Sequence, residues 1–551
     1  MLKLATTIKN PGEPGVDSRY HSPAELKALG YTGRVLFETT GLSGVPDPEA
    51  ITDTELRRWA QQTQDSVTRA VEACEQVGLE AYLFYDVLVL ARDVVERNKP
   101  GLTCKNRPDV LCPASDGVYK QVFASLDAMI RRWPGIAGIM LRFGDTEAQR
   151  LPHLLGNDLY TPHCPRCSQF GRADRVVQVL EQAHRLVVEK HQKRLIARAW
   201  NVRPYGMHDT ADLAERIAQR LPGSPDDDRL VLSFKFTETD FWRYQPWNRA
   251  SLRCGGRPVM YELQCQREFE GKGGVPNWQV PLWRDGAPES GDAAGGGVNG
   301  LAAAAERVNL VGLLSWVRGG GWGGPFLRDE TWIDANAYAV PRLADDLSAD
   351  PSQIARDWVD QRLGLSDPAA AEVVVRILKH SPEMVRQAFY IGPFATQKAN
   401  PWHPAADWIQ DDVLDAAAAW RMVQRLEPAD LDAAVTEKVA AVATVAADRR
   451  DLQQLLGDRN HPRLEKLVNA LLYTESLFEA LRDLIAGLVA FRRYEISESP
   501  ADAEVARRQL FDAQSHWNHH TQRHGSAPGT ATPFRETRFW EITQDILSRL
   551  S

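Results

Sequence analysis

Eight short apolar runs recur along the first three fifths of the chain, with amphipathic stretches such as Asp53–Val77 between them. Short apolar runs are typical of buried strands, and apolar positions spaced three and four apart are typical of helices with one buried face. Strands that alternate with helices predict a parallel sheet, and eight such units predict a closed (β/α)8 TIM barrel of the α/β class. The predicted strands are Leu2–Lys9, Arg34–Glu38, Ala81–Tyr85, Ile136–Leu141, Leu195–Ala199, Leu230–Phe236, Val259–Leu263 and Leu310–Trp316.

The pattern changes near Asp334, beyond which only helical periodicity is found. A chain of 551 residues is also too long for one compact core. The sequence therefore predicts two domains, a catalytic barrel over residues 1–333 and an all-α domain over residues 334–551. The alanine-rich helical segments of the second domain are Asp367–Phe389, Gln410–Arg425, Pro428–Gly457, Pro462–Glu495 and Ala501–His519.

The most informative polar pattern lies at the end of the seventh predicted strand. One parity of this segment carries Glu262, Gln264, Gln266 and Glu268. Because alternate residues of a strand point to opposite faces, and helices are expected to cover the apolar face, this row should point into the barrel lumen. Carboxylates are costly to bury there without a purpose, and a pair of them is what glycosidic bond cleavage requires.

Polar or aromatic clusters follow several other predicted strands as well. Barrel enzymes carry their active sites at the carboxyl ends of the strands, so these clusters are expected around one opening. Acidic groups follow the fourth, sixth and seventh strands. The clusters are Arg142–Glu147, Arg198–Asn201, Lys235–Trp242, Gln266–Glu268 and Trp316–Trp322.

The charge balance excludes a general nucleic-acid binder. The net charge is −8 with a sequence pI of about 6.0, and no long basic run offsets it. The first residues contain no apolar run long enough for a signal peptide, and no segment is long enough to span a membrane. We therefore expect a cytoplasmic protein that partners neither nucleic acid nor membrane.

The seven cysteines are an odd number in a large chain and do not indicate a disulfide framework. The one local motif is Cys164-Pro-Arg-Cys167, with Cys104 and Cys112 in an earlier loop. Four thiolates from two loops could hold a structural zinc. Reduced thiols or a disulfide are the other interpretations, and the sequence favours them because a CxxC motif alone is a weak signal. No metal and no cofactor are therefore expected.

At Asp240 and Glu268 the chain resembles glycoside hydrolase family 67, the α-glucuronidases that remove glucuronic or 4-O-methylglucuronic acid from xylan fragments. The family's K-N-G-P-M-D-F strand end is similar to Lys235–Phe241, and its E-x-Q-x-x-Q-E-Y-x-G pattern is similar to Glu262–Gly271. The two carboxylates have the same separation along the chain in both. The family's D-S-E is similar to Asp145-Thr146-Glu147, and its arginine after strand five aligns with Arg198. The similarity continues into residues 335–357, where the family begins its own helical domain.

The resemblance implies an exo-acting, inverting hydrolase of plant-type oligosaccharides. Glu147 would be the general acid, and Asp240 and Glu268 would be the base and the partner that positions water. Inversion predicts an acid-to-base separation of roughly 6.5–9.5 Å, against about 5–5.5 Å for a retaining enzyme. The family's helical domain also implies a homodimer contact. The residues expected to bind substrate are Arg198, Lys235 and Glu262, with Trp200, Trp242 and Trp322 stacking on sugar faces.

Each of these residues also has a purely structural interpretation. Asp240 could cap a helix, Glu268 could pair with Arg267 or Lys272, and the tryptophans could be core residues. Three departures from the family bear on the substrate: its N-terminal β-sandwich is absent, residues 236–239 replace its N-G-P-M stretch, and its carboxylate-binding lysine falls on Phe143. Two alternatives therefore stay open, a barrel glycosidase for a different sugar and a non-catalytic carbohydrate-binding relative.

Overall fold

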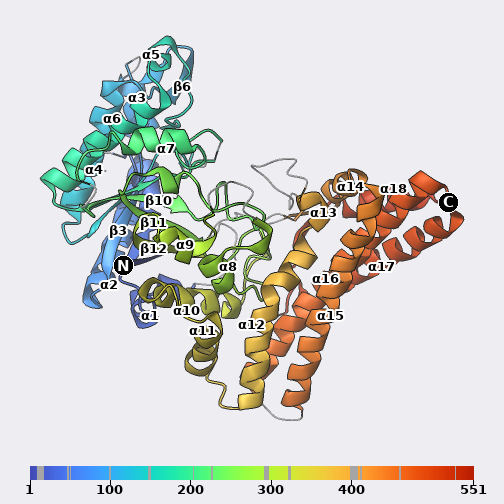
Figure 1. Ribbon diagram of the computed structural model, residues 1–551. Coiled ribbons are helices and arrows are strands. Elements are labelled where there is room, and N and C mark those ends of the chain that lie inside the picture. Colours follow the sequence, from blue (N-terminus) through green and yellow to red (C-terminus); the bar gives the residue numbers. More distant parts are fainter. Residues whose placement is uncertain are drawn as a thin grey trace.

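The computed structural model describes most of the chain. Figure 1 shows a barrel, coloured blue to green, beside a body of long helices, coloured yellow to red. Within the described residues, no helix combines the length and the apolar character needed to cross a bilayer. The described residues are 1–8, 18–45, 49, 51–98, 101–146, 151–202, 204–224, 227–290, 297–319, 324–396, 408–409, 413–457, 461–527 and 529–551.

Eight parallel strands close into a barrel in which β1 pairs with both β2 and β12. This confirms the predicted fold class and every predicted strand, although Lys9 at the end of the first lies outside the described residues. The strands are almost wholly buried on both faces, which explains why they read as continuous apolar runs. They are β1 (Leu2–Thr7), β2 (Gly33–Leu36), β3 (Glu80–Asp86), β7 (Gly138–Arg142), β9 (Arg194–Arg198), β10 (Leu230–Lys235), β11 (Pro258–Gln264) and β12 (Asn309–Arg318).

Amphipathic helices cover the outside of the barrel. The longest begins after Asp53, whose side chain accepts a hydrogen bond from the Leu56 N–H and caps the helix. Its buried positions recur every three to four residues, so one stripe packs on the strands. The covering helices are α1 (Pro23–Leu29), α2 (Thr54–Gln76), α4 (Asp116–Arg132), α6 (Arg172–His184), α7 (Ala211–Ala218), α8 (Val280–Asp285), α9 (Gly300–Ala305) and α10 (Thr331–Asp345).

Two insertions, one after β3 and one after β7, pair with each other beyond the carboxyl ends of these strands. The first forms β4 and an antiparallel hairpin of β5 and β6, and β4 then pairs antiparallel with β8 of the second. Figure 1 places α3, α5 and β6 together at the top of the view. The elements of the insertions are β4 (Val89–Ala91), α3 (Arg92–Asn98), β5 (Thr103–Cys104), β6 (Arg107–Leu111), β8 (Leu154–Gly156) and α5 (Pro165–Ser168).

The helix α10 completes the eighth βα unit of the barrel. Tyr31, which follows α1, donates its hydroxyl to the Ala337 carbonyl of α10 at 2.9 Å, and Tyr20 donates to Asp334 at 2.9 Å. The predicted boundary at residues 333/334 therefore falls inside this helix. The later helices are α11 (Pro351–Trp358), α12 (Pro368–Phe389), α13 (Gly392–Ala395), α14 (Ala416–Gln424), α15 (Leu431–Leu456), α16 (Pro462–Ser497), α17 (Pro500–His524) and α18 (Phe539–Arg549).

The described residues of the C-terminal region are mostly helical, as predicted. A short parallel pair of strands, β13 (Val413–Asp415) and β14 (Arg535–Thr537), joins two segments that are distant in sequence. The predicted helix Gln410–Arg425 therefore begins later, at Ala416, and residues 410–412 lie outside the described part of the chain.

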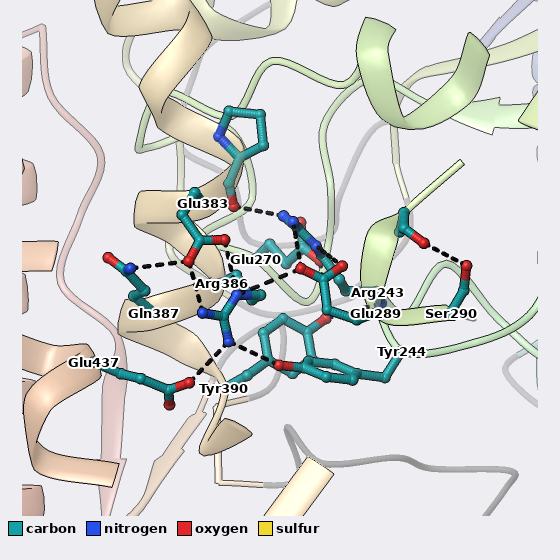
Figure 2. A network of polar contacts seen from close by, with 12 residues as sticks. Arg243, Tyr244, Glu270, Glu289, Ser290, Glu383, Arg386, Gln387, Tyr390 and Glu437 are labelled. Carbon is teal, nitrogen blue, oxygen red and sulfur yellow. Dashed lines mark hydrogen bonds and ion pairs between the residues drawn. The ribbon is translucent and has the colours of Figure 1, made fainter. Parts of the chain in front are cut away.

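A network of ion pairs joins the helices to two barrel loops, those after β10 and β11 (Figure 2). Two nitrogens of Arg243 each lie 3.0 Å from the Glu289 carboxylate, and Nη1 donates to the Pro382 carbonyl of α12 at 2.5 Å. Arg386 of α12 lies 3.4 Å from the same Glu289 and donates to Tyr244 and Glu437. We call Arg243, Glu270, Glu289, Arg386, Tyr390 and Glu437 the junction network.

Candidate active site

Charged side chains from five neighbouring strands meet at the carboxyl end of the barrel. The strand register brings them together: Arg142 stands opposite Asp86 on one side and Arg198 on the other, and Lys235 stands opposite Glu262. These residues are all buried. Because such charges are stable inside a protein only when paired, the contacts among them determine what the opening can do.

Glu262 lies at the floor of this opening. The Arg198 Nε lies 3.0 Å from both of its carboxylate oxygens, and Ser233 and the Trp316 indole donate to it at 2.9 Å each. Its side chain has no exposed area. The prediction that the polar parity of the seventh strand faces the lumen is confirmed at this position. A direct contact of Glu262 with substrate stays a prediction, and its observed contacts hold Arg198 in place.

Arg198 links the floor to the rim of the opening. Its Nη1 donates to Asp145 at 2.8 Å, and Arg142 Nη1 lies 3.7 Å from the same carboxylate. Arg142 itself forms a two-bond pair with Asp86, at 2.5 and 2.9 Å. Asp86, Arg142, Asp145, Arg198 and Glu262 thus form one chain of alternating charge, which we call the lumen network.

The lumen network fixes the ionisation of Asp145. Burial acts to raise the pKa of this carboxyl, but the charges of Arg142 and Arg198 outweigh it and leave the pKa below the ordinary value. Burial likewise acts to lower the pKa of Arg198, and the carboxylates of Glu262 and Asp145 raise it instead. About a quarter of the Asp145 side chain is exposed, at 25%. Asp145 is therefore an ionised group on the rim.

Lys235 and Asp240 form a second pair beside the lumen network. Lys235 donates to Asp240, which also accepts a hydrogen bond from the Phe241 N–H at 2.8 Å. The Lys235 ammonium lies 3.6 Å from the ring centre of Trp200 and 4.5 Å from that of Phe241, so two aromatic rings enclose it. The Asp240 side chain remains 18% exposed. Asp240 is thus held in one position while part of it faces solvent.

Glu268 follows the seventh strand in a turn, so strand parity does not set its direction. The strand β11 ends at Gln264, and Arg267 has a φ of 53°, so the alternation of faces stops before Glu268. The extension of the polar row through Gln266 and Glu268 as a strand was therefore wrong. The Glu268 N–H donates to the Gln264 side chain at 2.9 Å, and Glu268 is 6% exposed.

An aromatic stack joins the loop of Glu268 to the loop of Asp240. Phe269 lies on Trp242 with ring centres 3.8 Å apart and planes 7° apart. Trp242 is buried, and Trp200 donates its indole N–H to the Thr239 carbonyl at 2.6 Å beneath Lys235. One face of each tryptophan is thus occupied by the protein, and sugar stacking by either stays a prediction.

Two residues predicted from sequence, Glu147 and Trp322, lie outside the described residues. The separation of acid and base, and with it the inverting outcome, therefore stays a prediction. Sequence reasoning also missed Asp86, the carboxylate that pairs with Arg142. The available signal was an acid directly after the apolar run Ala81–Tyr85, at the position where a strand enters the mouth of a barrel.

No family model matches the chain, and no curated protein is similar to it in sequence. Among solved structures, a GH138 enzyme targeting pectin rhamnogalacturonan II superposes with a TM-score of 0.57 at 11% identity, over 100% of this chain and 83% of that one. A mutant of the Thermobaculum terrenum O-GlcNAc hydrolase has a TM-score of 0.43 at 10% identity, covering 100% and 94%. The Flavobacterium johnsoniae chitobiase has a TM-score of 0.38 at 10% identity, covering 100% and 78%. The first likeness shows a shared fold, one that a glycoside hydrolase uses, and does not single out family 67.

Proposed function

We propose that this protein is a glycoside hydrolase that cleaves an O-glycosidic bond at the mouth of its barrel. One observation carries the proposal: loops that carry carboxylates and follow three different strands are held at the carboxyl end of the barrel by contacts with their neighbours. Arg198 holds Asp145 above Glu262, and the stack of Trp242 on Phe269 joins the loops of Asp240 and Glu268. The barrel shared with a known glycoside hydrolase supports the same proposal at the level of fold.

Glycoside hydrolysis needs one protonated and one ionised carboxyl group. Asp145 does not suit the protonated role, because the neighbouring arginines hold its pKa below the ordinary value. We therefore retain Glu147, two residues further along the same loop, as the proposed acid. Asp240 and Glu268 would activate and position the attacking water, and Asp145 would stabilise positive charge that develops on the sugar ring.

The finer proposal concerns the sugar. By its resemblance to family 67, the enzyme would act as an exo-α-glucuronidase that removes glucuronic or 4-O-methylglucuronic acid from plant-type oligosaccharides. The carboxylate of that sugar would approach Arg198 and Lys235, the cations that line the mouth. Arginine is suited to this because its planar fork matches a carboxylate.

A second candidate, a glycosidase for a neutral sugar, is favoured by one feature of the site. Arg142, Arg198 and Lys235 each already bind a carboxylate of the protein. A uronic acid would have to displace or share these partners, and a neutral sugar would not. The two candidates therefore differ in whether a cation of the mouth exchanges partners when substrate binds.

A panel of aldouronic acids and neutral disaccharides tests both candidates, with products identified by mass spectrometry. We expect wild type to release a monosaccharide from at least one class and Glu268→Gln to release almost none. The matched control is Glu306→Gln, which should behave as wild type. Glu306 is exposed and lies between α9 and the amino end of β12, whereas the mouth lies at the carboxyl ends of the strands. Hydrolysis that persists in Glu268→Gln, or binding without hydrolysis by wild type, would contradict the proposal.

A further inference from the structure

Four cysteines from the two insertions meet at one point. Cys104 ends β5 and Cys112 follows β6, while Cys164 and Cys167 flank the first turn of α5. All four are buried, and their sulfur atoms all lie within 4.8 Å of one another. The sulfur–sulfur distance is 3.5 Å for Cys164 and Cys167, 3.7 Å for Cys112 and Cys164, and 4.0 Å for Cys104 and Cys167.

These distances match the edges of a tetrahedron of zinc ligands. A zinc–sulfur bond of about 2.3 Å places tetrahedral sulfur atoms about 3.8 Å apart. The three separations given above lie on both sides of that value, between 3.5 and 4.0 Å. All four cysteines are free thiols in the structure, and a single disulfide would use only two of the four converging sulfur atoms.

The surroundings of the cluster also suit negatively charged sulfur. The backbone N–H groups of His163 and Cys164 donate to the Cys167 sulfur at 3.1 and 3.2 Å, and Arg166 Nε donates to the Cys112 sulfur at 3.3 Å. Such donors are the outer-shell partners that orient metal ligands. Apart from the cysteines, the described apolar residues packed against the cluster are Val110 and Ala114. Few apolar side chains therefore pack directly against the cluster.

We propose that Cys104, Cys112, Cys164 and Cys167 bind one structural zinc ion. Four sulfur ligands in a tetrahedron are typical of zinc or iron–sulfur sites, and a complete ligand set with no open position is typical of a structural site. The ion would fasten the β5–β6 hairpin to α5, and so would join the insertion after β3 to the insertion after β7. The sequence favoured reduced thiols because Cys112 and Cys164 are 52 positions apart, and only the fold brings them together.

The same region lines a polar hollow of about 300 Å³ beside the mouth of the barrel. Arg107 and Asp109 come from β6, His163 precedes the cluster, and Thr146 directly follows Asp145 in the chain. If the proposed function holds, the zinc-bound insertions would shape a subsite for a further sugar unit. Asp109→Ala should then raise KM several-fold while kcat and zinc content stay unchanged. An unchanged KM would overturn the subsite alone.

Metal analysis of the full-length protein, purified without added metal, tests the zinc site without reference to activity. We expect about one zinc ion per chain by mass spectrometry. Cys112→Ser and Cys167→Ser should lose the ion, and Cys254→Ser, a buried cysteine outside the cluster, should keep it. Iron in place of zinc, no metal at all, or a disulfide found within the cluster by peptide mapping would overturn the assignment.

A second measurement covers the case in which the cysteine variants fail to fold. Wild-type protein produced with cobalt should show the strong visible absorption of tetrahedral cobalt thiolate. Titration of the zinc protein with a thiol-reactive mercurial should release the ion as the reagent caps the four thiolates, and should lower the unfolding temperature. A cobalt protein without that absorption would overturn the proposal, whether or not the enzyme proves to be a glycosidase.

Discussion

The lumen network and the junction network are both built from arginine–carboxylate pairs, but their members come from different parts of the molecule. In the lumen network, the arginines come from adjacent strands, and the barrel register sets Arg142 beside Asp86 and Arg198. In the junction network, Arg243 comes from a barrel loop and Arg386 comes from α12, and both reach Glu289 (Figure 2). One network lies within the barrel strands and the loop after β7, whereas the other exists only when two parts of the molecule are docked.

The two networks also differ in what remains open to solvent. The floor of the lumen network is sealed at Asp86 and Glu262, whereas Asp145 on its rim stays partly exposed. In the junction network, Glu270 is sealed by Arg267, Asn277 and the Tyr390 hydroxyl. A carboxylate enclosed by fixed partners can support structure but cannot reach a substrate. We infer that chemistry belongs to the rim of the mouth, and that the junction and the floor hold the rim in place.

The largest effect is expected from Asp240→Asn at the rim. If Asp240 acts as the base or positions water, this change should lower kcat by about 10²–10⁴-fold. That loss corresponds to about 3–5 kcal/mol in the barrier. The free energy of unfolding should fall by less than the barrier rises, since Asp240 is partly exposed and the amide can still accept from the Phe241 N–H. Kinetics and denaturant unfolding of the same preparation provide the comparison, and a loss of stability equal to the loss in rate would assign Asp240 to structure.

The junction should show the opposite balance in Arg386→Met. This change removes the arginine that lies 2.9 Å from Glu437, and removes one of the two arginines beside Glu289, which keeps Arg243. Breaking a buried pair from one side costs about 3–5 kcal/mol, and because Arg386 is partly exposed we expect the lower end of that range. The kcat per folded molecule should change little.

The matched control for this variant is Arg421→Met, since Arg421 is well exposed and its Asp415 contact is 4.0 Å long. Its effect on the free energy of unfolding should be within about 0.5 kcal/mol. Equal destabilisation by both variants would remove the special role of the junction.

A smaller effect is expected from Tyr390→Phe. The Tyr390 hydroxyl donates to Glu270 at 2.8 Å and accepts from the Arg243 N–H at 3.1 Å, so its loss leaves two buried polar groups with fewer partners. Such a loss costs about 1–3 kcal/mol. Tyr494→Phe on α16, where the ring is only partly buried, should be near neutral when both are measured by urea unfolding.

Features formed within one segment of the chain could be predicted from the sequence, whereas features that join distant segments could not. The eight strands were predictable because both faces of a parallel strand are buried, which leaves a local apolar run such as Leu230–Phe236. The inward direction of Glu262 followed from parity within the same strand. The direction of Glu268 could not be predicted in this way, because the strand ends before it and Arg267 has a left-handed backbone.

Features that join distant segments could not be predicted from local patterns. Arg243 and Arg386 read as surface charges on a loop and a helix, and only the docked fold brings them to Glu289. The cysteine cluster is similar, since each half of it is a weak motif by itself. The resemblance to family 67 pointed to Asp145 and Arg198, but it could not show that these two residues bind each other.

The dependence of stability on pH gives a further comparison of the two networks, through Asp145 at the rim and Glu270 at the junction. Burial acts to raise the pKa of each, but the arginines beside them outweigh it and leave both pKa values below the ordinary range. A carboxyl whose folded pKa is depressed contributes stability that is present above its unfolded pKa of about 4, and this stability is lost as the pH falls through the folded value. Both residues should therefore stabilise the protein at pH 7 and cease to do so in strong acid.

Denaturant unfolding at pH 7, 5 and 3 measures this effect. The free energy of unfolding should fall less between pH 7 and pH 3 in Asp145→Asn and in Glu270→Gln than in wild type. The reduction should be larger for Glu270→Gln, because water screens the partly exposed Asp145 and does not reach Glu270. An equal reduction in both variants would show that the rim of the mouth is as closed as the junction, and the proposed division of chemistry from structure would then fail.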